Sequence, residues 1–202
     1  AGVVRLSVNI NKVATLRNSR GGQMPSVVEA VQVCVAAGAP GITVHPRADA
    51  RHITAADVRA VAHALAPHRD RVEYNIEGDP RSDLLALVRE VRPHQLTLVP
   101  VQAGEVTSQA GWPATTSTDA LGAVVQEMRA LGVRTSLFVD ATPGAVRWAN
   151  EVGADRIEIY TEPFARAFEA SPIAAQAVFA LHVEVAPILA TLDGDRQNDP
   201  AD

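Results

Sequence analysis

The segment Gly41-Ile-Thr-Val-His45, followed after a polar loop by Thr54-Ala-Ala-Asp-Val-Arg-Ala-Val-Ala-His-Ala-Leu65, decides the fold. The first run is short, apolar and β-branched, which is typical of a buried strand. The second run spaces its apolar residues three or four positions apart, as one face of a helix requires. Thr54 stands where a helix N-cap accepts a backbone N–H. The segment is therefore predicted to form one strand followed by one helix.

The same order recurs along the chain. We predict strands at 4–10, 41–45, 71–76, 95–100, 133–140 and 156–160, and helices at 26–37, 55–65, 82–91, 119–131 and 143–152. Regular repetition of strand and helix favours a parallel sheet, either a barrel or a doubly wound sheet.

Residues that start and stop helices support these boundaries. Gly38, Gly132 and Gly153 stand where the end of a helix needs a left-handed residue, each just before a predicted strand. Thr142 precedes Pro143, as an N-cap precedes the first helical position.

Polar side chains near the strand ends favour the barrel. A period of two puts alternate residues of a strand on one face, and helices should cover both faces of an open parallel sheet. Polar side chains gathered from several strands are typical of the mouth of a TIM-type β/α barrel, where the catalytic groups lie. The alternative is a set of half-exposed strands on a solvated sheet. The polar sets are Ser7, Asn9 and Asn11; Thr43, His45 and Arg47; Glu73, Asn75 and Glu77; Ser136 and Asp140; Glu158 and Tyr160.

The length of 202 residues limits how much of a barrel is expected, since eight βα units typically need about 250 residues. Six units are predicted, with the last two strands missing or altered, because Pro187 interrupts the apolar run 183–192. A further helix is predicted at 173–181. We expect residues 1–192 to form a single β/α-barrel-type domain and 193–202 to form a disordered acidic tail.

Composition excludes several classes of protein. A net charge of −5 argues against a general nucleic-acid or anionic-membrane binder, and no apolar run approaches the roughly 18 residues of a membrane span. The start lacks the layout of a signal peptide, so the cytoplasm is the expected compartment. Cys34, the one cysteine, is expected as a buried helix residue without a disulfide or metal partner. Metal-ligand spacings, nucleotide-binding loops and a serine-hydrolase elbow are absent from the sequence, so no metal or cofactor is expected.

Two cationic segments follow predicted strands. Lys12, Arg17 and Arg20 precede two glycines and are predicted to form an anion cradle, although such loops are also found simply solvated. The second segment begins at His45 and Arg47, where a histidine at a strand end is a candidate general acid or base or a structural residue.

Two acidic residues complete the candidate chemistry. Glu77 and Glu158 fall at the ends of two other strands, and a carboxylate inside a barrel is costly unless it is hydrogen-bonded or functional. Surface or helix-capping roles are expected for the remaining histidines, which are His63, His68, His94 and His182.

Several motifs together resemble the pyridoxine 5′-phosphate synthase family. They are Val-Asn-Ile-Asn-Lys-Val-Ala-Thr-Leu-Arg-Asn-Ser-Arg-Gly, Gly-Ile-Thr-Val-His-Pro-Arg with Arg-His-Ile-Thr, Leu-Thr-Leu-Val-Pro, Glu-Val-Thr-Ser and Ser-Leu-Phe-Val-Asp, in order between about residues 4 and 170. The resemblance implies a cytoplasmic homo-octamer of β/α barrels that works in vitamin B6 biosynthesis without a cofactor. Members condense 1-deoxy-D-xylulose 5-phosphate with 3-amino-2-oxopropyl phosphate to pyridoxine 5′-phosphate, phosphate and water by acid/base catalysis.

The resemblance also implies roles for individual residues. His45 and Glu77 match proton acceptors, and Glu158 matches a transition-state stabiliser. Asn9 and Arg20 match positions that bind the aminoketone phosphate. Those that match the deoxyxylulose phosphate site are Asn11, Lys12, Arg47, His52 and Thr107.

The chain departs from the family pattern in two places. Asn11-Lys12 replaces the Asp-His of many members, and Lys12 is expected to bind phosphate or, if desolvated, to act as a nucleophile. The Asn-Ala-Gly-His and Gly-His motifs of the family's last two strands are not found. Two alternatives therefore stay open: a truncated, non-catalytic barrel remnant that binds phosphorylated ligands or a full-length partner, and another phosphosugar-processing barrel enzyme.

Overall fold

A computed structural model describes residues 4–101, 110–171 and 173 of the chain. The chain divides into two compact units, one made of residues 1–98 and 128–135 and the other of residues 99–127 and 136–202. The division passes through helix α5 (Thr118–Ala130) and strand β5 (Arg134–Asp140).

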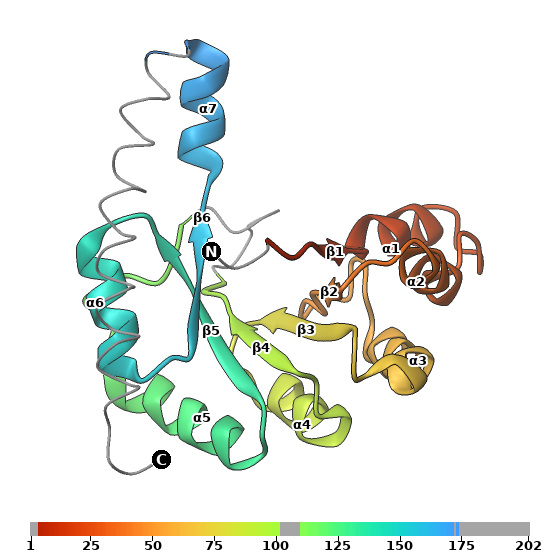
Figure 1. The fold of residues 1–202 in the computed structure, drawn as a ribbon, viewed down its shortest axis with the longest axis horizontal. Coiled ribbons are helices and arrows are strands. Elements are labelled where there is room, and N and C mark those ends of the chain that lie inside the picture. Colours follow the sequence, from red (N-terminus) through yellow and green to blue (C-terminus); the bar gives the residue numbers. More distant parts are fainter. Residues whose placement is uncertain (1–3, 102–109, 172, 174–202) are drawn as a thin grey trace. The chain divides into compact units, whose positions relative to one another are not determined.

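The first unit contains four strands, and helices follow each of the first three within it. Its strands pair in parallel with their neighbours in chain order, from β1 to β4 (Figure 1). A doubly wound sheet reverses this order at a switch point, whereas a barrel keeps it. The strands are β1 (Ser7–Asn9), β2 (Gly41–Val44), β3 (Glu73–Gly78) and β4 (Gln95–Leu98), and the helices are α1 (Asn11–Asn18), α2 (Val27–Ala36), α3 (Ala55–Leu65) with the short 3₁₀ helix η1 (Ala66–His68), and α4 (Ser82–Val91).

The second unit continues the same repeat. Residues 136–140 of β5 pair in parallel with β6 (Arg156–Tyr160), and α6 (Pro143–Val152) connects the two strands. Trp148 on α6 is buried and donates its indole N–H to the Thr116 carbonyl at 2.8 Å. Helix α7 (Glu162–Ala170) follows β6. Within the described residues, six parallel strands in chain order, each followed by a helix, confirm the predicted TIM-type α/β class with six βα units.

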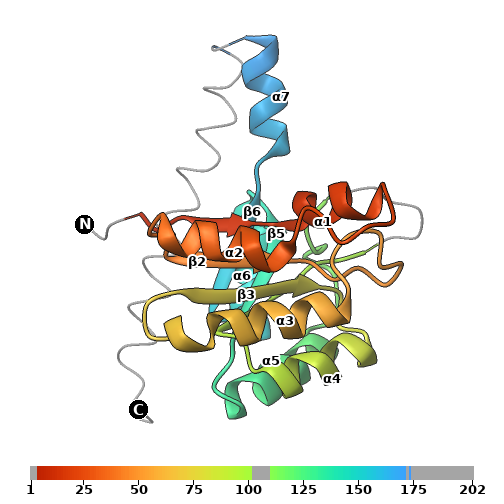
Figure 2. The ribbon, with the colours of Figure 1, turned by 90° about the vertical axis from the view of Figure 1, so that its right-hand side faces the viewer.

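The helices of the first unit bury one face each. Helix α2 packs against α3, and α3 against α4, and Figure 2 shows the three helices along the same side of the strands. Val58 and Val61 of α3 are fully buried, as are Leu84 and Val88 of α4. These pairs are three or four residues apart, so each pair lies on one helix face. Burial of each such side chain contributes about 1.5–3 kcal/mol.

Most element boundaries were predicted from the sequence. The helices at 55–65, 82–91 and 143–152 and the strand at 156–160 are confirmed residue for residue. The backbones of Gly38, Gly132 and Gly153 are left-handed, with φ of 84°, 72° and 87°. Thr54 and Thr142 cap their helices by accepting a backbone N–H at 3.2 Å. Local stop and start signals therefore operate here as the isolated sequence indicates.

Two α-helices, α1 and α7, were not predicted, and the first strand was predicted too long. The strand at 4–10 is reduced to Ser7–Asn9 because the paired stretch of β2 is short, and Val4 and Leu6 are exposed. Most of the predicted anion cradle forms helix α1. The helix was not predicted because its polar residues lack a clear apolar periodicity, and because its N-cap, Ile10, has no side chain that can cap a helix. Helix α7 has only Phe164 and Phe168 as large apolar residues, and they stack on each other.

Some expectations lie outside the described residues or remain untested. The predicted helix at 173–181, apart from Ile173, and the tail at 193–202 lie outside the described residues, as does His182. The single domain at 1–192 stays a prediction. Cys34 lies on a helix as expected, but it is only half-buried, because its position on α2 falls between the core face and solvent.

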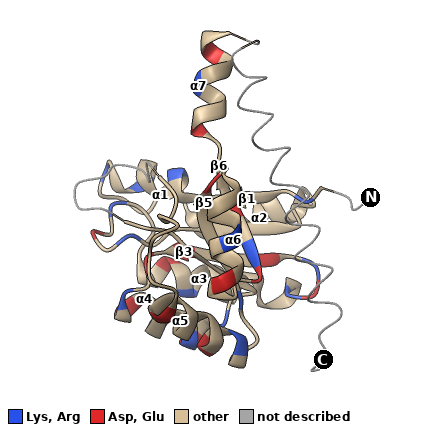
Figure 3. Cartoon of the chain, turned by 90° about the vertical axis from the view of Figure 1, so that its left-hand side faces the viewer, with Lys and Arg blue, Asp and Glu red and all other residues tan. Residues whose placement is uncertain are grey.

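Charge is mixed on the described helices. Acidic and basic positions both occur along α4 and α5 (Figure 3), in keeping with the small net charge. In the described ranges, the structure contains no helix long and apolar enough to cross a membrane.

Asp57 connects three parts of the first unit. Its carboxylate accepts the Thr54 backbone N–H at 2.8 Å, which completes a capping box at the start of α3. The same carboxylate accepts both terminal nitrogens of Arg17 on α1, at 2.6 and 2.9 Å. Burial raises the pKa of Asp57, but the hydrogen bonds from Arg17 and Thr54 outweigh it and leave the pKa below its ordinary value.

Asp57→Ala is expected to lower the free energy of unfolding by about 2–3 kcal/mol, because it removes a cap and two charge-assisted hydrogen bonds. Urea unfolding followed by circular dichroism measures the change. Glu29→Ala is the matched control, since Glu29 holds the same third position of α2 and is exposed. Equal losses in the two variants would show that the Arg17 pair and the box add nothing.

Candidate active site

A hydrogen-bonded row of polar side chains crosses the strands of the first unit. Ser7 Oγ and Thr43 Oγ1 are 2.7 Å apart, Asn75 Nδ2 donates to Thr43 Oγ1 at 3.3 Å, and Thr97 Oγ1 donates to Asn75 Oδ1 at 3.0 Å. One member comes from each of β1 to β4, and Thr43, Asn75 and Thr97 are buried. The row shows that this face of the strands is polar although it is covered.

Two candidate catalytic side chains lie beyond this row. His45 follows Thr43 by two residues and Glu77 follows Asn75 by two, so each shares the face of its predecessor. His45 Nδ1 lies 3.6 Å from Glu77 Oε2, and the His45 Nε2 atom is buried without a hydrogen-bond partner among the described residues. The predicted pair is therefore brought together at the ends of β2 and β3.

Burial controls the protonation of His45. The pKa of His45 is lowered to about 4, chiefly because burial disfavours the charged imidazolium. The cationic groups of Arg47, His52 and Arg81 lower it as well, while Asp79 opposes them. At neutral pH the ring is uncharged and can accept a proton.

Asn9 and Asn11 hold the end of β1 against the end of β2. Asn9 Oδ1 accepts the backbone N–H of Asn11 at 2.9 Å, and Asn11 Oδ1 accepts the backbone N–H of His45 at 2.9 Å. Asn11 thus fixes the His45 backbone, and Asn9 fixes the backbone of Asn11.

The loop after β2 brings Arg47 and His52 close to His45. Arg47 is buried, and the His45 and His52 rings meet edge to face with centroids 6.3 Å apart. His52 Nδ1 accepts the Ile53 backbone N–H at 2.9 Å, so the proton of the neutral ring is on Nε2 and is available for donation. Burial is the main cause of the lowered pKa of His52.

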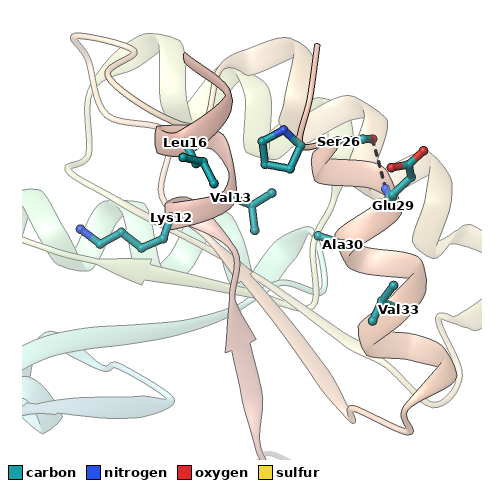
Figure 4. A pocket seen from close by; sticks show the side chains of 8 residues that line it. Lys12, Val13, Leu16, Ser26, Glu29, Ala30 and Val33 are labelled. Atoms are coloured by element: carbon teal, nitrogen blue, oxygen red, sulfur yellow. Dashed lines mark hydrogen bonds between the residues drawn. The ribbon is translucent and has the colours of Figure 1, made fainter. Parts of the chain in front are cut away.

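Lys12 and Arg20 are the exposed cationic residues among the predicted site residues. The charge of Lys12 contributes to the lowered pKa of His52, which places the ammonium near the loop after β2. Lys12 also borders a groove of about 520 Å³ between α1 and α2, but Figure 4 shows its side chain pointing away from Ala30 and Val33 of α2. Apolar side chains line most of that groove, so it is a poor phosphate site.

Arg17 was predicted to belong to the anion cradle, but in the structure it pairs with Asp57. Its guanidinium is engaged by Asp57, and its Nε donates to Asn18 Oδ1 at 3.0 Å. Because the fork is already occupied by a carboxylate, Arg17 supports the start of α3 and does not serve as a phosphate ligand. Lys12 and Arg20 remain as candidate cations of this segment.

The second unit holds the other predicted catalytic residue. Glu158 is partly buried on β6, where it is in register with Phe138 of β5, and burial raises its pKa. The Phe138 and Tyr160 rings meet edge to face at 5.5 Å on the same pair of strands. Thr107 lies outside the described residues.

Sequence reasoning missed one charged pair close to His45. Asp79 and Arg81 follow β3 directly, and Arg81 Nη1 lies 2.6 Å from Asp79 Oδ1. Their charges act on His45 in opposite directions. Their positions, two and four residues after Glu77, could have indicated that they lie near the same strand end.

The remaining histidines of the described residues have structural positions, as predicted. His94 accepts the Tyr74 backbone N–H at Nδ1 and contacts the Arg69 carbonyl at 3.0 Å, while His63 is exposed on α3. In the described part of the chain, no three His, Cys, Asp or Glu side chains are grouped as metal ligands.

Comparison with known proteins gives a family match over most of the chain. The model of a family described as "Pyridoxal phosphate biosynthesis protein PdxJ" matches residues 6–191. A protein of Bacteroides thetaiotaomicron named pyridoxine 5′-phosphate synthase is 49% identical over 88% of this chain and 73% of its own length. A protein of the same name from Phocaeicola vulgatus is 45% identical over 94% of this chain and 76% of its own length.

Solved structures of more distant proteins share the fold alone. A crystal structure of a mandelate oxidase variant has a TM-score of 0.56 and 15% sequence identity, and covers 90% of this chain and 62% of that one. Another mandelate oxidase structure has a TM-score of 0.52 over 78% of this chain and 52% of that one.

The buried neutral imidazole predicts a specific pH dependence of stability. The folded pKa of His45, about 4, lies below the unfolded value near 6.5, so the unfolded chain binds an additional proton as the pH falls between them. From pH 7 to pH 4.5 the chain should therefore lose about 2 kcal/mol more unfolding free energy than its His45→Gln variant. Urea unfolding at both pH values measures this difference, and parallel losses would contradict a buried neutral ring.

Proposed function

The chain belongs to the PdxJ family, and we propose on this basis that it is a pyridoxine 5′-phosphate synthase whose base is His45. In the proposed reaction, 1-deoxy-D-xylulose 5-phosphate and 3-amino-2-oxopropyl phosphate condense to pyridoxine 5′-phosphate, phosphate and water. The carrying observation is the buried His45 ring, whose Nε2 has no partner in the described residues and whose Nδ1 lies near Glu77. Such a ring is suited to accept protons from a bound molecule.

The reaction needs repeated proton transfers. The amine of the aminoketone must condense with the ketone of the sugar phosphate, with loss of water, and carbon–hydrogen bonds must then be broken to enolise the joined chain. Each of these steps moves a proton at a carbon, nitrogen or oxygen atom, and general acid–base groups accelerate such steps by about 10²–10⁴. No electron transfer is required.

His45 and Glu77 are suited to the proton-accepting steps. In the neutral ring the proton belongs on Nδ1, because the opposite tautomer would direct a lone pair at the Glu77 carboxylate. Nε2 is then the accepting atom. When it takes a proton, the carboxylate 3.6 Å from Nδ1 stabilises the imidazolium, and a shortening of that distance would strengthen this effect.

Glu158 is suited to a different task. Its raised pKa keeps the carboxyl group protonated to a higher pH than an exposed glutamate. A protonated carboxyl can donate a hydrogen bond to oxygen as negative charge develops on it. We assign Glu158 to transition-state stabilisation.

The two phosphates need cationic and neutral donors. Arg47, Lys12 and the Nε2–H of His52 supply them for the deoxyxylulose phosphate, and Asn11 and Thr107 are assigned to the same phosphate. Asn9 and Arg20 are assigned to the aminoketone phosphate. We further propose that the chain acts in the cytoplasm as a homo-octamer, as the family resemblance implies.

His45→Gln should reduce kcat by about 10²–10⁴, because it removes the proton acceptor while retaining a polar side chain of similar size. Product formation from both substrates is measured, and circular dichroism confirms the fold. His63→Gln is the matched control, since His63 is exposed on α3. Near-normal turnover of His45→Gln would reject the assignment, and a folded wild-type chain that binds both phosphates without forming product would support the non-catalytic alternative.

Lys12→Ala should raise KM for the deoxyxylulose phosphate about tenfold with little change in kcat, because one charge-assisted contact is lost. Lys12→Arg retains the charge and should remain close to wild type. Borohydride added during turnover should leave no adduct on Lys12, which peptide mass spectrometry can check without ambiguity because it is the only lysine. A reduced adduct there would show that Lys12 is a nucleophile.

A further inference from the structure

Arg81 makes three contacts behind the candidate base. Its Nη2 donates to the Pro46 carbonyl at 2.5 Å, its Nη1 lies 2.6 Å from Asp79 Oδ1, and its Nε lies 3.0 Å from Asp83 Oδ1. All three nitrogens of the guanidinium are therefore used, and its side chain is only 17% exposed. Asp79 in the same loop and Asp83 in the first turn of α4 orient the fork, and the third contact reaches the loop after β2.

The carbonyl that Arg81 holds lies between two proposed functional residues. Pro46 separates His45 from Arg47, and β2 ends at Val44, so this peptide is outside the strand ladder. Asn11 holds the His45 N–H from the side of α1. Arg81 supplies the corresponding bond from the β3–α4 loop.

A pocket adjoins the loop after β2 on the side of Arg81. This pocket of about 390 Å³ lies beside Pro46 and Arg47, and is lined also by Ile53, which precedes α3, and by Leu84 of α4. A void provides no close contacts to fix the position of the loop. The hydrogen bond from Arg81 to the Pro46 carbonyl restrains the loop beside this pocket.

The charges facing His45 come from three segments. They are Glu77 from β3, Arg47 and His52 from the loop after β2, and Asp79 and Arg81 from the loop after β3. Arg81 disfavours the imidazolium and Asp79 favours it. Loss of the Arg81 charge must therefore make His45 easier to protonate.

We infer that Arg81, oriented by Asp79, is a positioning residue of the proposed reaction, which holds the Pro46 carbonyl and so sets the places of the His45 imidazole and the Arg47 guanidinium. The inference rests on the proposed function. A role in stability alone would be met by the pairs with Asp79 and Asp83, without a bond to the peptide between the two functional side chains.

Two substitutions distinguish the effect of the Arg81 charge from the effect of its guanidinium hydrogen bonds. Arg81→Gln should lower kcat/KM by about 10- to 100-fold, because misplacing a reacting group by a fraction of an ångström has effects of that size. Its acid limb in the pH profile of kcat/KM should also move to higher pH, since the base is protonated more readily. Arg81→Lys keeps the positive charge, but an ammonium group cannot contact Pro46, Asp79 and Asp83 together as the guanidinium does. Its kcat/KM should therefore fall, while the acid limb of its pH profile stays in place.

Arg59→Gln is the matched control. Arg59 lines the same pocket and pairs with Glu90 at 2.7 Å on the exposed faces of α3 and α4. The hydrogen bond to the Pro46 carbonyl comes from Arg81. Its rate and pH profile should remain those of the wild type. A rate for Arg81→Gln within roughly twofold of Arg59→Gln, together with an unmoved acid limb, would overturn the inference.

A second measurement keeps this inference separate from the proposed function. If the wild-type chain forms no product, the proposed function fails, and the titration of His45 by NMR in the same variants then tests the positioning role. A higher pKa of His45 in Arg81→Gln and an unchanged one in Arg81→Lys support the contact. Equal titration in all variants overturns it.

Discussion

Desolvation of the His45 imidazole is the constraint on which the rest of the site depends. The residue is only 7% exposed, and a charged ring is far more costly to remove from water than a neutral one. At neutral pH the ring is therefore uncharged, with Nε2 unpartnered in the described residues. An exposed histidine would be protonated in part near its ordinary pKa of about 6.5. Burial thus keeps His45 in its neutral, proton-accepting form at neutral pH.

A buried polar residue must be held in place, and the surrounding elements do this through long-range hydrogen bonds. The Ser7–Thr43–Asn75–Thr97 row satisfies polar groups on the covered face of four strands. Beyond the row, the side chains of Asn11 and Arg81 bond the backbone on either side of the base. An unsatisfied buried polar group costs about 1–3 kcal/mol. The network therefore stabilises the fold at the same positions at which it orients the site.

Local patterns were enough to predict most elements but not the long-range pairs. The period of two correctly placed His45 beside Thr43 and Glu77 beside Asn75, because strand geometry alone fixes which residues share a face. Helix α1 was missed because its polar residues resemble those of a loop. Arg17 was wrongly assigned to an anion cradle because its partner, Asp57, lies 40 residues away in the sequence. The contact of Arg81 with Pro46 likewise depends on two loops that only the fold brings together.

The family match and the site geometry support each other. Relatives named pyridoxine 5′-phosphate synthase share close to half of their aligned residues with this chain, which spans 73% of the length of the Bacteroides thetaiotaomicron relative. The most direct test is the ¹⁵N chemical shift of the two His45 ring nitrogens in labelled protein at pH 7. A protonated Nδ1 with an unprotonated Nε2 is the predicted result. Protonation of both nitrogens, or of Nε2 alone, would contradict a neutral base held against Glu77.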